Sequence, residues 1–245
     1  MRVVFLGATK GMGRALSRLM AERGDTMYLL GRNEVDIERS AADLSVRGAG
    51  DSVRWAVCNL EQSETFAPAI AGGRKALGGL DAVVVTAGMF ATQEELEADP
   101  ALAERLLRVD FTNTVVFCEV AKKALLEQGG GILCVFSSVA GERGRKPVIL
   151  YGAAKAGLTR YLEGLDHKHH ADGLRVVTVK PGFVKTSMTA GLGPPPFAGE
   201  PEAVARRVLR AIDRGTPVVY APAPWRLIMA IIRALPRAIM RRINF

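Results

Sequence analysis

Seven short apolar segments recur along the chain, and longer stretches with a helical period of apolar positions lie between them. The apolar segments predict strands over residues 3–6, 26–30, 53–57, 82–86, 131–136, 175–179 and 218–220. The stretches between them predict helices over residues 11–23, 34–46, 62–77, 101–128, 151–171 and 201–213. Because the strands are rich in valine on both faces and alternate with helices, we expect one α/β domain with a parallel sheet covered on both sides.

The composition narrows the class of protein without choosing a function. A length of 245 residues fits one α/β domain. Cys58, Cys118 and Cys134 lie in apolar stretches without the spacing of a zinc site, so we expect free thiols in a reducing compartment. The first apolar run is too short for a signal peptide, and no apolar stretch reaches the ~20 residues that span a bilayer, so we expect a cytoplasmic protein. The net charge of +8 indicates an anionic partner: a nucleotide, a lipid surface or a nucleic acid.

A glycine-rich loop joins the first predicted strand to the first predicted helix. Gly7, Gly11 and Gly13 permit a tight turn, a close approach of backbone to a ligand, and close packing of the helix on the strand. The N–H groups at the start of the helix then face an anion, and the helix dipole adds to the attraction. The loop therefore predicts a phosphate-binding site, whereas the alternative is a glycine-rich turn with no ligand.

Three further motifs follow the glycine loop along the chain. They are Val-Thr-Ala-Gly at 85–88, Ser138 placed 13 residues before the pair Tyr151-x-x-x-Lys155, and Lys-Pro-Gly-Phe-Val-Lys-Thr at 180–186. Together with the spacing Gly-x-x-x-Gly-x-Gly, these motifs resemble those of the short-chain dehydrogenase/reductase family, with Thr86 where the family usually has asparagine. The resemblance implies a Rossmann-type, doubly wound parallel sheet of about seven strands and an oxidoreductase that binds a nicotinamide cofactor.

The second predicted strand ends at Arg32, where NAD-binding sheets of this type carry an acidic residue for the ribose hydroxyls. Arg32 and Lys10 would form a cationic clamp for the adenosine 2′-phosphate, so we expect NADP(H); the alternative is two unrelated surface cations. Asn59 replaces the family's usual aspartate at the adenine edge, where its amide could make a similar contact. The expected cofactor-binding residues are Gly7, Thr9, Lys10, Gly11, Met12, Gly13, Arg32, Asn33, Asn59, Leu60, Ala87, Gly88, Tyr151, Lys155, Pro181, Gly182, Val184 and Thr186.

Carbonyl reduction by hydride needs a proton for the developing alkoxide. Tyr151 is the expected donor, and Lys155, one helical turn later on the same face, would lower its pKa. Ser138 is expected to orient the substrate oxygen by a hydrogen bond, and the resemblance implies that Lys155 also holds the nicotinamide ribose. Asp110 stands where the family's fourth catalytic residue, an asparagine, is usual, and Asn113 follows one turn later. Either Asp110 is protonated or screened by water, or the proton relay through Lys155 is weaker than usual.

These features favour an NADP(H)-dependent oxidoreductase that acts on a carbonyl or a secondary alcohol. Segments 137–158 and 218–245 are also similar to the reductases of decaprenylphosphoryl 2-keto-pentose, and this likeness implies a lipid-linked keto-sugar as substrate. A reductase of another apolar ketone is an alternative, because side branches of the family change substrate through the loop at 187–200. A protein that senses NADP(H) without turnover is a second alternative, which Asp110 favours and the Ser138, Tyr151 and Lys155 set opposes.

The prolines and glycines at 191–201 predict a loop near the site rather than a domain boundary. We therefore expect a cofactor-binding catalytic domain over 1–223, with a substrate loop over 187–200, followed by a basic amphipathic segment over 224–245. Pro236 is expected to kink or divide the helix of that segment. Its apolar stripe is predicted to comprise Trp225, Ile228, Ile232, Leu235, Ile239 and Ile243, with Arg226, Arg233, Arg237 and Arg241 opposite.

Residues 225–243 are predicted to lie on a lipid surface at the inner face of the membrane, or else to pack on their own domain or across a homo-oligomer. His167, His169 and His170 lie near a helix C-terminus, which the helix dipole favours, so we expect no metal site. The arginines at 206–214 accompany no recognisable nucleic-acid motif and predict a solvated helix face. We therefore expect a small-molecule or lipid-linked carbonyl substrate, a homo-oligomer and no nucleic-acid partner.

Overall fold

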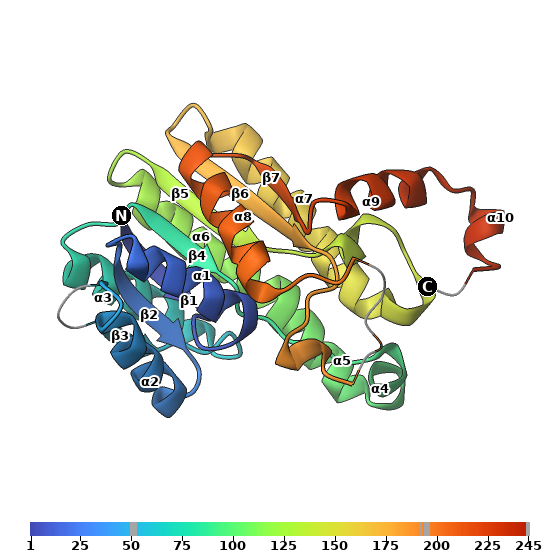
Figure 1. Ribbon diagram of the computed structural model, residues 1–245, viewed down its shortest axis with the longest axis horizontal. Coiled ribbons are helices and arrows are strands. Elements are labelled where there is room, and N and C mark those ends of the chain that lie inside the picture. The colour runs from blue at the N-terminus through green and yellow to red at the C-terminus, as the bar shows by residue number, and fades with distance from the viewer. Residues whose placement is uncertain (50–52, 192, 194–196, 244–245) are drawn as a thin grey trace.

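A seven-stranded parallel sheet forms the centre of the molecule, with the strand order β3-β2-β1-β4-β5-β6-β7 (Figure 1). The computed structural model describes residues 1–49, 53–191, 193 and 197–243. The strands are β1 (Arg2–Leu6), β2 (Thr26–Gly31), β3 (Arg54–Val57), β4 (Ala82–Val85), β5 (Gly131–Phe136), β6 (Leu174–Pro181) and β7 (Val218–Ala221). All seven predicted strands are confirmed to within two residues at each end. The α/β class and the parallel, doubly wound sheet are confirmed as well.

Helices cover both faces of the sheet (Figure 1). Alternate residues of β1 supply the two cores: Val3 and Phe5 belong to the cluster that includes residues of α1 and α8, and Val4 and Leu6 to the cluster that includes residues of α3, α6 and α7. This alternation is the side-chain period of a strand buried on both faces. The helices on the two faces are α1 (Gly11–Glu22), α2 (Glu34–Ser45), α3 (Phe66–Leu77), α6 (Thr114–Leu126), α7 (Ile149–His169) and α8 (Pro201–Arg214).

The helix predicted over 101–128 is not one regular helix. It consists of α5 (Pro100–Leu107), a π-helical turn η2 (Arg108–Asn113) and α6. The π-helical turn contains one of the predicted site residues, Asp110, and π-turns inside helices often mark functional sites. A short helix α4 (Gln93–Ala98) was not predicted, although Thr92 and Glu95 form a capping box at its start.

The 3₁₀ turns are short and lie mostly on loops. They are η1 (Ser63–Thr65), η3 (Val139–Glu142), η4 (Lys146–Val148) and η5 (Ser187–Thr189). The predicted substrate loop at 187–200 begins with η5, and Gly199 pairs with Val184 in an isolated bridge. Residues 192 and 194–196 of that loop lie outside the described part of the chain.

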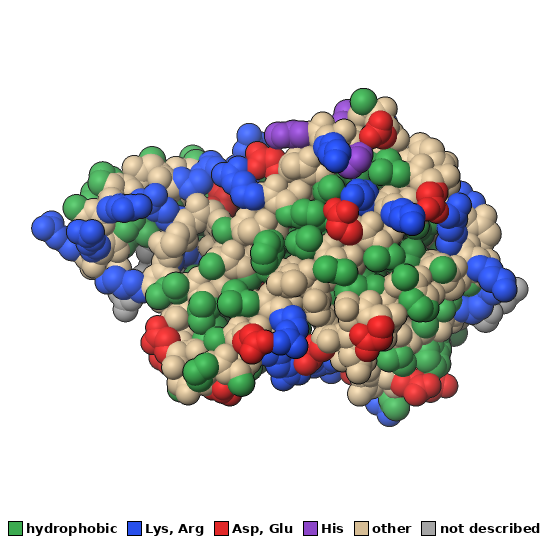
Figure 2. All heavy atoms as spheres, turned by 180° about the vertical axis from the view of Figure 1, so that it is seen from behind, with side chains coloured by type: hydrophobic (Ala, Val, Ile, Leu, Met, Phe, Trp, Pro, Cys, Tyr) green, Lys and Arg blue, Asp and Glu red, His purple; other side chains and the backbone are tan. Residues whose placement is uncertain are grey.

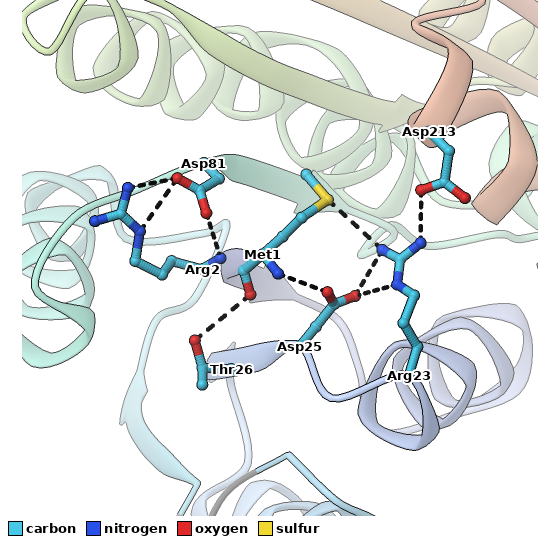
Figure 3. A network of polar contacts seen from close by, with 7 residues as sticks. All are labelled: Met1, Arg2, Arg23, Asp25, Thr26, Asp81 and Asp213. Carbon is cyan, nitrogen blue, oxygen red and sulfur yellow. Dashed lines mark hydrogen bonds and ion pairs between the residues drawn. The ribbon is translucent and has the colours of Figure 1, made fainter.

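A network of ion pairs lies along the edge of the sheet at which the strands begin (Figure 3). Asp25 is 3% exposed and accepts from the amine of Met1 at 2.7 Å and from Arg23 Nε at 2.8 Å. Arg23 also binds Asp213 of α8 at 2.5 Å. This edge is opposite to the one at which the glycine loop follows β1.

The C-terminal segment forms α9 (Trp225–Ala234) and α10 (Arg237–Met240), which Pro236 separates as predicted. Trp225, Met229 and Ile232 are buried in a cluster with Val139. For α9, the structure supports the alternative that the stripe packs on the chain's own domain rather than on lipid: Trp225, Ile228 and Ile232 all pack in this cluster, because that face meets the turn after β5. Within the described residues, no helix has both the length and the apolar character needed to cross a membrane.

Candidate active site

The predicted motifs meet at the edge of the sheet where the strands end. The glycine loop follows β1, residues 86–88 follow β4, Ser138 follows β5 by two positions, and residues 182–186 follow β6. In open α/β sheets, ligands bind at this carboxyl edge. The topology therefore brings together four motifs that are far apart in the sequence.

The glycine loop is held by side-chain and backbone contacts that leave no room for larger residues. Gly7 has a φ of +100°, which favours glycine, and a Cβ there would lie 2.6 Å from Ala87 N. A Cβ on Gly13 would lie 2.1 Å from the Gly7 carbonyl oxygen. Thr86 replaces the family's asparagine and donates a hydrogen bond from Oγ1 to that same oxygen at 2.9 Å. The loop thus packs directly on the end of β4.

The start of α1 is suited to an anion. Lys10 stands at the N-cap without capping the helix through its side chain, and the first turn carries no acidic residue. The N–H groups of that turn lack intrahelical partners, and the positive end of the helix dipole lies there. This arrangement can hold the diphosphate of a dinucleotide.

A cleft of about 410 Å³ extends from the glycine loop. The predicted residues on its wall are Gly7, Thr9, Lys10, Arg32, Asn33, Asn59, Leu60, Ala87 and Gly88. The wall also contains Asp36, Cys58, Glu61, Phe90, Ser187 and Met188, which the sequence analysis did not select as cofactor contacts. A larger hollow of about 1140 Å³ lies at the opposite edge of the sheet, where Arg2, Gly130 and Arg175 line it, away from the motifs.

Two predicted amides in the cleft also hold the local backbone. Asn33 caps α2, and its Oδ1 accepts from Asp36 N–H at 2.9 Å. Asn59 Oδ1 accepts from Glu61 N–H at 3.1 Å. Both residues therefore shape the cleft wall in addition to lining it.

The two cations selected for the 2′-phosphate both line the cleft. Arg32 is exposed, and Lys10 Nζ lies 3.0 Å from Asp36 Oδ2. The pKa of Glu61 is held below its ordinary value mainly by its hydrogen bonds with Arg105, and the charge of Arg32 adds to this effect. Asp36 and Glu61 are thus acidic neighbours that the sequence analysis missed; Asp36 lies in the first turn of α2, where acids are common for reasons of capping alone.

Tyr151 and Lys155 lie one turn apart on α7, beside Ser138. Lys155 Nζ is 5.5 Å from the centre of the Tyr151 ring, and the Ser138 side chain is close enough to act on the pKa of Tyr151. Burial raises the pKa of Tyr151, while the charge of Lys155 and the Ser138 side chain act to lower it. Ser138 Oγ also accepts from Ala140 N–H at 3.0 Å, which fixes the side chain at the start of η3.

Asp110 is fully buried and contacts Lys155. Its Oδ1 accepts from Met89 N–H at 2.8 Å, and its Oδ2 lies 3.5 Å from Lys155 Nζ. That second oxygen accepts no hydrogen bond from the described residues. Burial raises the pKa of Asp110 against the opposing charge of Lys155. Burial acts to lower the pKa of Lys155, but the attraction of Asp110 and Tyr151 outweighs it and the pKa is raised.

Two neighbours define the surroundings of this pair. A Cβ on Gly88 would lie 2.9 Å from Asp110 Oδ1 and 3.4 Å from Lys155 Nζ, so the narrow space there requires glycine. Asn113, the other amide of this motif, instead donates from Nδ2 to the Leu60 carbonyl at 2.5 Å. Asp110 alone of the two therefore contacts the Lys155 ammonium.

The loop after β6 closes the site from the other side. Gly182 N–H donates to the Ala221 carbonyl at 3.0 Å, and a Cβ on Gly182 would lie 2.2 Å from Trp225 Nε1. Val184 is buried, and Thr186 N–H donates to Thr189 Oγ1 at 3.0 Å. Thr186 also approaches the glycine loop, since a Cβ on Gly11 would lie 3.2 Å from Thr186 Cγ2.

The chain matches the family model described as short chain dehydrogenase over residues 1–195. It is 34% identical over 240 residues to an uncharacterized oxidoreductase of Mycobacterium tuberculosis, covering 98% of this chain and 96% of the relative. It is 32% identical over 242 residues to an uncharacterized oxidoreductase of Streptomyces coelicolor, covering 98% and 95%.

Solved structures share the fold. Levodione reductase matches with a TM-score of 0.80 at 21% identity, covering 89% of this chain and 95% of that one. A short-chain type dehydrogenase/reductase from Mycobacterium ulcerans matches with a TM-score of 0.80 at 20% identity, covering 89% and 87%.

Proposed function

The chain belongs to the short-chain dehydrogenase/reductase family of oxidoreductases, and on that premise we propose that it transfers hydride between NADP(H) and a carbonyl or secondary alcohol. The observation that carries the proposal is the meeting of Ser138, Tyr151 and Lys155 beside a cleft built on the glycine loop. A protein that only sensed the cofactor would need the cleft but not these three side chains.

The residues divide the work of carbonyl reduction. The cleft on the glycine loop would hold a nicotinamide cofactor, which would supply the hydride for the carbonyl carbon. Tyr151 donates its phenolic proton to the oxygen, so that an alcohol and a phenolate result, and solvent returns the proton. Ser138 donates a hydrogen bond to the same oxygen as negative charge develops there. The Lys155 ammonium stabilises the phenolate, and its contact with Asp110 fixes its position.

Lys10 and Arg32 support the choice of NADP(H). A phosphate between them would gain charge-assisted hydrogen bonds, each worth about 1.5–3 kcal/mol when well formed. Asp36 moderates this gain, because the phosphate must compete with its carboxylate for Lys10. Among the described residues, no carboxylate forms an ion pair with Arg32, so Arg32 is the residue to test.

We expect Arg32→Asp to weaken NADPH binding by about tenfold or more and to improve binding of NADH, as titration calorimetry with each cofactor would measure. Arg39→Asp is the matched control, because Arg39 is exposed on α2, the helix that begins two residues after Arg32, but does not line the cleft. An unmodified protein that binds both cofactors equally would remove the basis for the clamp.

The substrate class we propose is a lipid-linked keto-sugar, on the likeness of segments 137–158 and 218–245 to reductases of that type. Another apolar ketone is the alternative, since the wall formed by Phe90 and Met188 is apolar. Lys and Arg side chains gather at the end of the molecule that carries α9 and α10 (Figure 2). A basic surface of this kind would bring the protein to the anionic lipid in which a lipid-linked substrate lies. There Leu227 and Ile231 are 68% and 57% exposed, and we propose that this outer face of α9 contacts anionic lipid.

The decisive experiment follows NADPH absorbance with a panel of keto-sugars and apolar ketones, for the unmodified protein and for Tyr151→Phe. We expect turnover of at least one carbonyl, its loss in Tyr151→Phe, and nearly unchanged cofactor affinity in that variant, because the phenol supplies the proton and few cofactor contacts. Unchanged turnover in Tyr151→Phe would defeat the mechanism. Absence of any turnover, with tight NADPH binding, would favour the sensor.

A further inference from the structure

A second buried charge cluster lies behind the site, and the reaction described above does not use it. The side chain of Glu142 is 4% exposed. Its Oε1 accepts from Lys180 Nζ at 2.5 Å and from the Tyr220 hydroxyl at 2.9 Å. Its Oε2 is buried without a hydrogen bond, and the nearest cation of an ion pair there is Arg233, whose Nε lies at 3.6 Å. A carboxylate buried to this degree needs partners of this kind to be tolerated at all.

The cluster joins the two loops on either side of the reacting centre. Glu142 ends the turn η3, whose N-cap is Ser138. Lys180 is the last residue but one of β6, which leads directly into the loop that closes the site from the other side. The backbone hydrogen bonds between β5 and β6 end with the one that Ser137 N–H donates to the Val179 carbonyl at 2.8 Å. Beyond that bond, the Glu142–Lys180 pair connects the two segments.

The two cations of the cluster come from different elements. Lys180 pairs with Tyr220 in the register of β6 and β7, and its Nζ lies 5.4 Å from the centre of the Tyr220 ring. Burial, followed by the contact with Glu142, raises the pKa of Tyr220 to about 12, so the phenol remains a donor at neutral pH. Arg233 extends from α9.

The helix α9 adds two further contacts to the same turn. Arg143 Nη2 donates to the Leu235 carbonyl at 2.8 Å, at the end of α9. Met229 and Ile232 pack on Val139, the residue that follows Ser138. The turn that carries Ser138 is therefore held from β6 and β7 through Glu142, and from α9 through Val139 and Arg143.

We propose that Glu142 is a positioning residue, whose bond to Lys180 sets the turn that carries Ser138 against the loop at 181–186. The inference rests on the proposed hydride transfer, in which Ser138 and Tyr151 must meet the carbonyl oxygen while that loop lies over the other reactant. An error of about 1 Å in such an arrangement can cost about 100-fold in rate. Glu142 touches none of the reacting groups and acts through the turn.

The test compares Glu142→Gln with Asp25→Asn. Asp25 is the matched control, since it is equally buried and also holds two cations, but at the opposite edge of the sheet (Figure 3). Each substitution removes a buried carboxylate charge from the two cations that face it, so we expect both to lower Tm. We expect Glu142→Gln alone to lower kcat, by about 10- to 100-fold, with the Kd for NADPH within about twofold of the unmodified protein. All rates are measured well below the lowest Tm.

A double variant separates positioning from stability. Glu142→Gln with Lys180→Met removes the unpaired ammonium together with the carboxylate, so Tm should recover relative to Glu142→Gln. The link between the two loops is still absent, so kcat should stay low. Recovery of kcat together with Tm would assign the pair to stability alone and overturn the proposal, as would a normal kcat in Glu142→Gln.

Hydrogen exchange tests the positioning role of Glu142 even if the protein reduces no carbonyl in the panel. We expect Glu142→Gln to speed exchange in residues 138–143 and 181–186, and Asp25→Asn to leave both segments unchanged. Equal exchange in the unmodified protein and Glu142→Gln overturns the positioning role. Faster exchange without turnover in the unmodified protein means that the proposed reaction fails while the link between the loops stands.

Discussion

At the scale of single residues, Asp110 is the side chain that most distinguishes this site. A carboxylate replaces the family's usual amide, and it is fully buried with one oxygen 3.5 Å from Lys155 Nζ. The charge of Asp110 acts on both partners: it favours the ammonium of Lys155 and disfavours the phenolate of Tyr151. The pair therefore affects the pH at which the phenol donates its proton.

Asp110→Asn should move the alkaline limit of carbonyl reduction to lower pH. Without the negative charge, the pKa of Tyr151 falls, and the protonated phenol required for reduction is lost at a lower pH. The pKa of Lys155 also falls, so its ammonium is lost at a lower pH. Without the ammonium, the phenolate that forms on proton donation is no longer stabilised, and this loss also moves the alkaline limit to lower pH. The measurement is the pH profile of kcat with a reducible ketone; an unchanged limit, or a shift to higher pH, would contradict this account.

The sequence allowed the proximity of Tyr151 and Lys155 to be predicted, because their spacing on a helix fixes their common face. It also selected Asp110 rather than Asn113 for the fourth position, and the structure places Asp110 against Lys155. The Lys10–Asp36 ion pair could not be predicted, because a first-turn acid has an ordinary explanation as a helix-stabilising charge. The contact between Glu142 and Lys180 could not be predicted either, since the two residues are 38 positions apart in the sequence.

At the scale of elements, the glycine loop depends on the contact between its own carbonyl and the end of β4. Gly13→Ala places a methyl group 2.1 Å from the Gly7 oxygen and 2.5 Å from Thr86 Oγ1. Because one contact is with backbone, the loop must shift and the Thr86–Gly7 hydrogen bond must lengthen or break. We expect a loss of about 1–3 kcal/mol in the free energy of unfolding and at least about tenfold weaker NADPH binding, measured by denaturant titration and calorimetry.

Gly164→Ala is the control for this substitution. Gly164 lies inside α7, and a Cβ there meets nothing within 4 Å. Alanine should therefore leave cofactor binding unchanged and be neutral or stabilising, by about 0.5–1 kcal/mol. A Gly13→Ala protein with the same stability and NADPH affinity as Gly164→Ala would show that the loop does not need its close packing.

The strands could be predicted from sequence because each is a short, mostly apolar run that lies near glycine, proline, asparagine or charged residues. The interruption of the helix at 101–128 could not, because the residues 108–113 are compatible with a regular α-helix. Tertiary contacts select the π-helical turn there: Asp110 bonds Met89 N–H, while Asn113 bonds the Leu60 carbonyl. The same limitation applies to α9, because the sequence does not show whether its apolar stripe meets lipid or the chain's own domain, and in the structure the stripe meets Val139.

At the scale of the whole molecule, the carboxyl edge of the sheet and the C-terminal segment form one continuous assembly. The turn after β5 contacts the reacting centre through Ser138 and α9 through Val139. Lys and Arg side chains gather beyond that contact, on the end that carries α9 and α10 (Figure 2). The helix α9 thus has an inner face that belongs to the core and an outer face that is open to a partner.

A matched pair of substitutions separates these two faces. Met229 is fully buried and Leu227 is 68% exposed, two positions earlier on α9. Met229→Ala should cost about 2–5 kcal/mol in the free energy of unfolding, because it leaves a cavity against Val139. Leu227→Ala together with Ile231→Ala should change stability by less than about 1 kcal/mol, since both side chains are on the surface.

In sedimentation with anionic vesicles at moderate salt, we expect the double variant to lose binding and Met229→Ala, below its Tm, to retain it, because the apolar contact with lipid belongs to the outer face. Equal recovery of the unmodified protein and the double variant in the supernatant would leave α9 with its packing role alone.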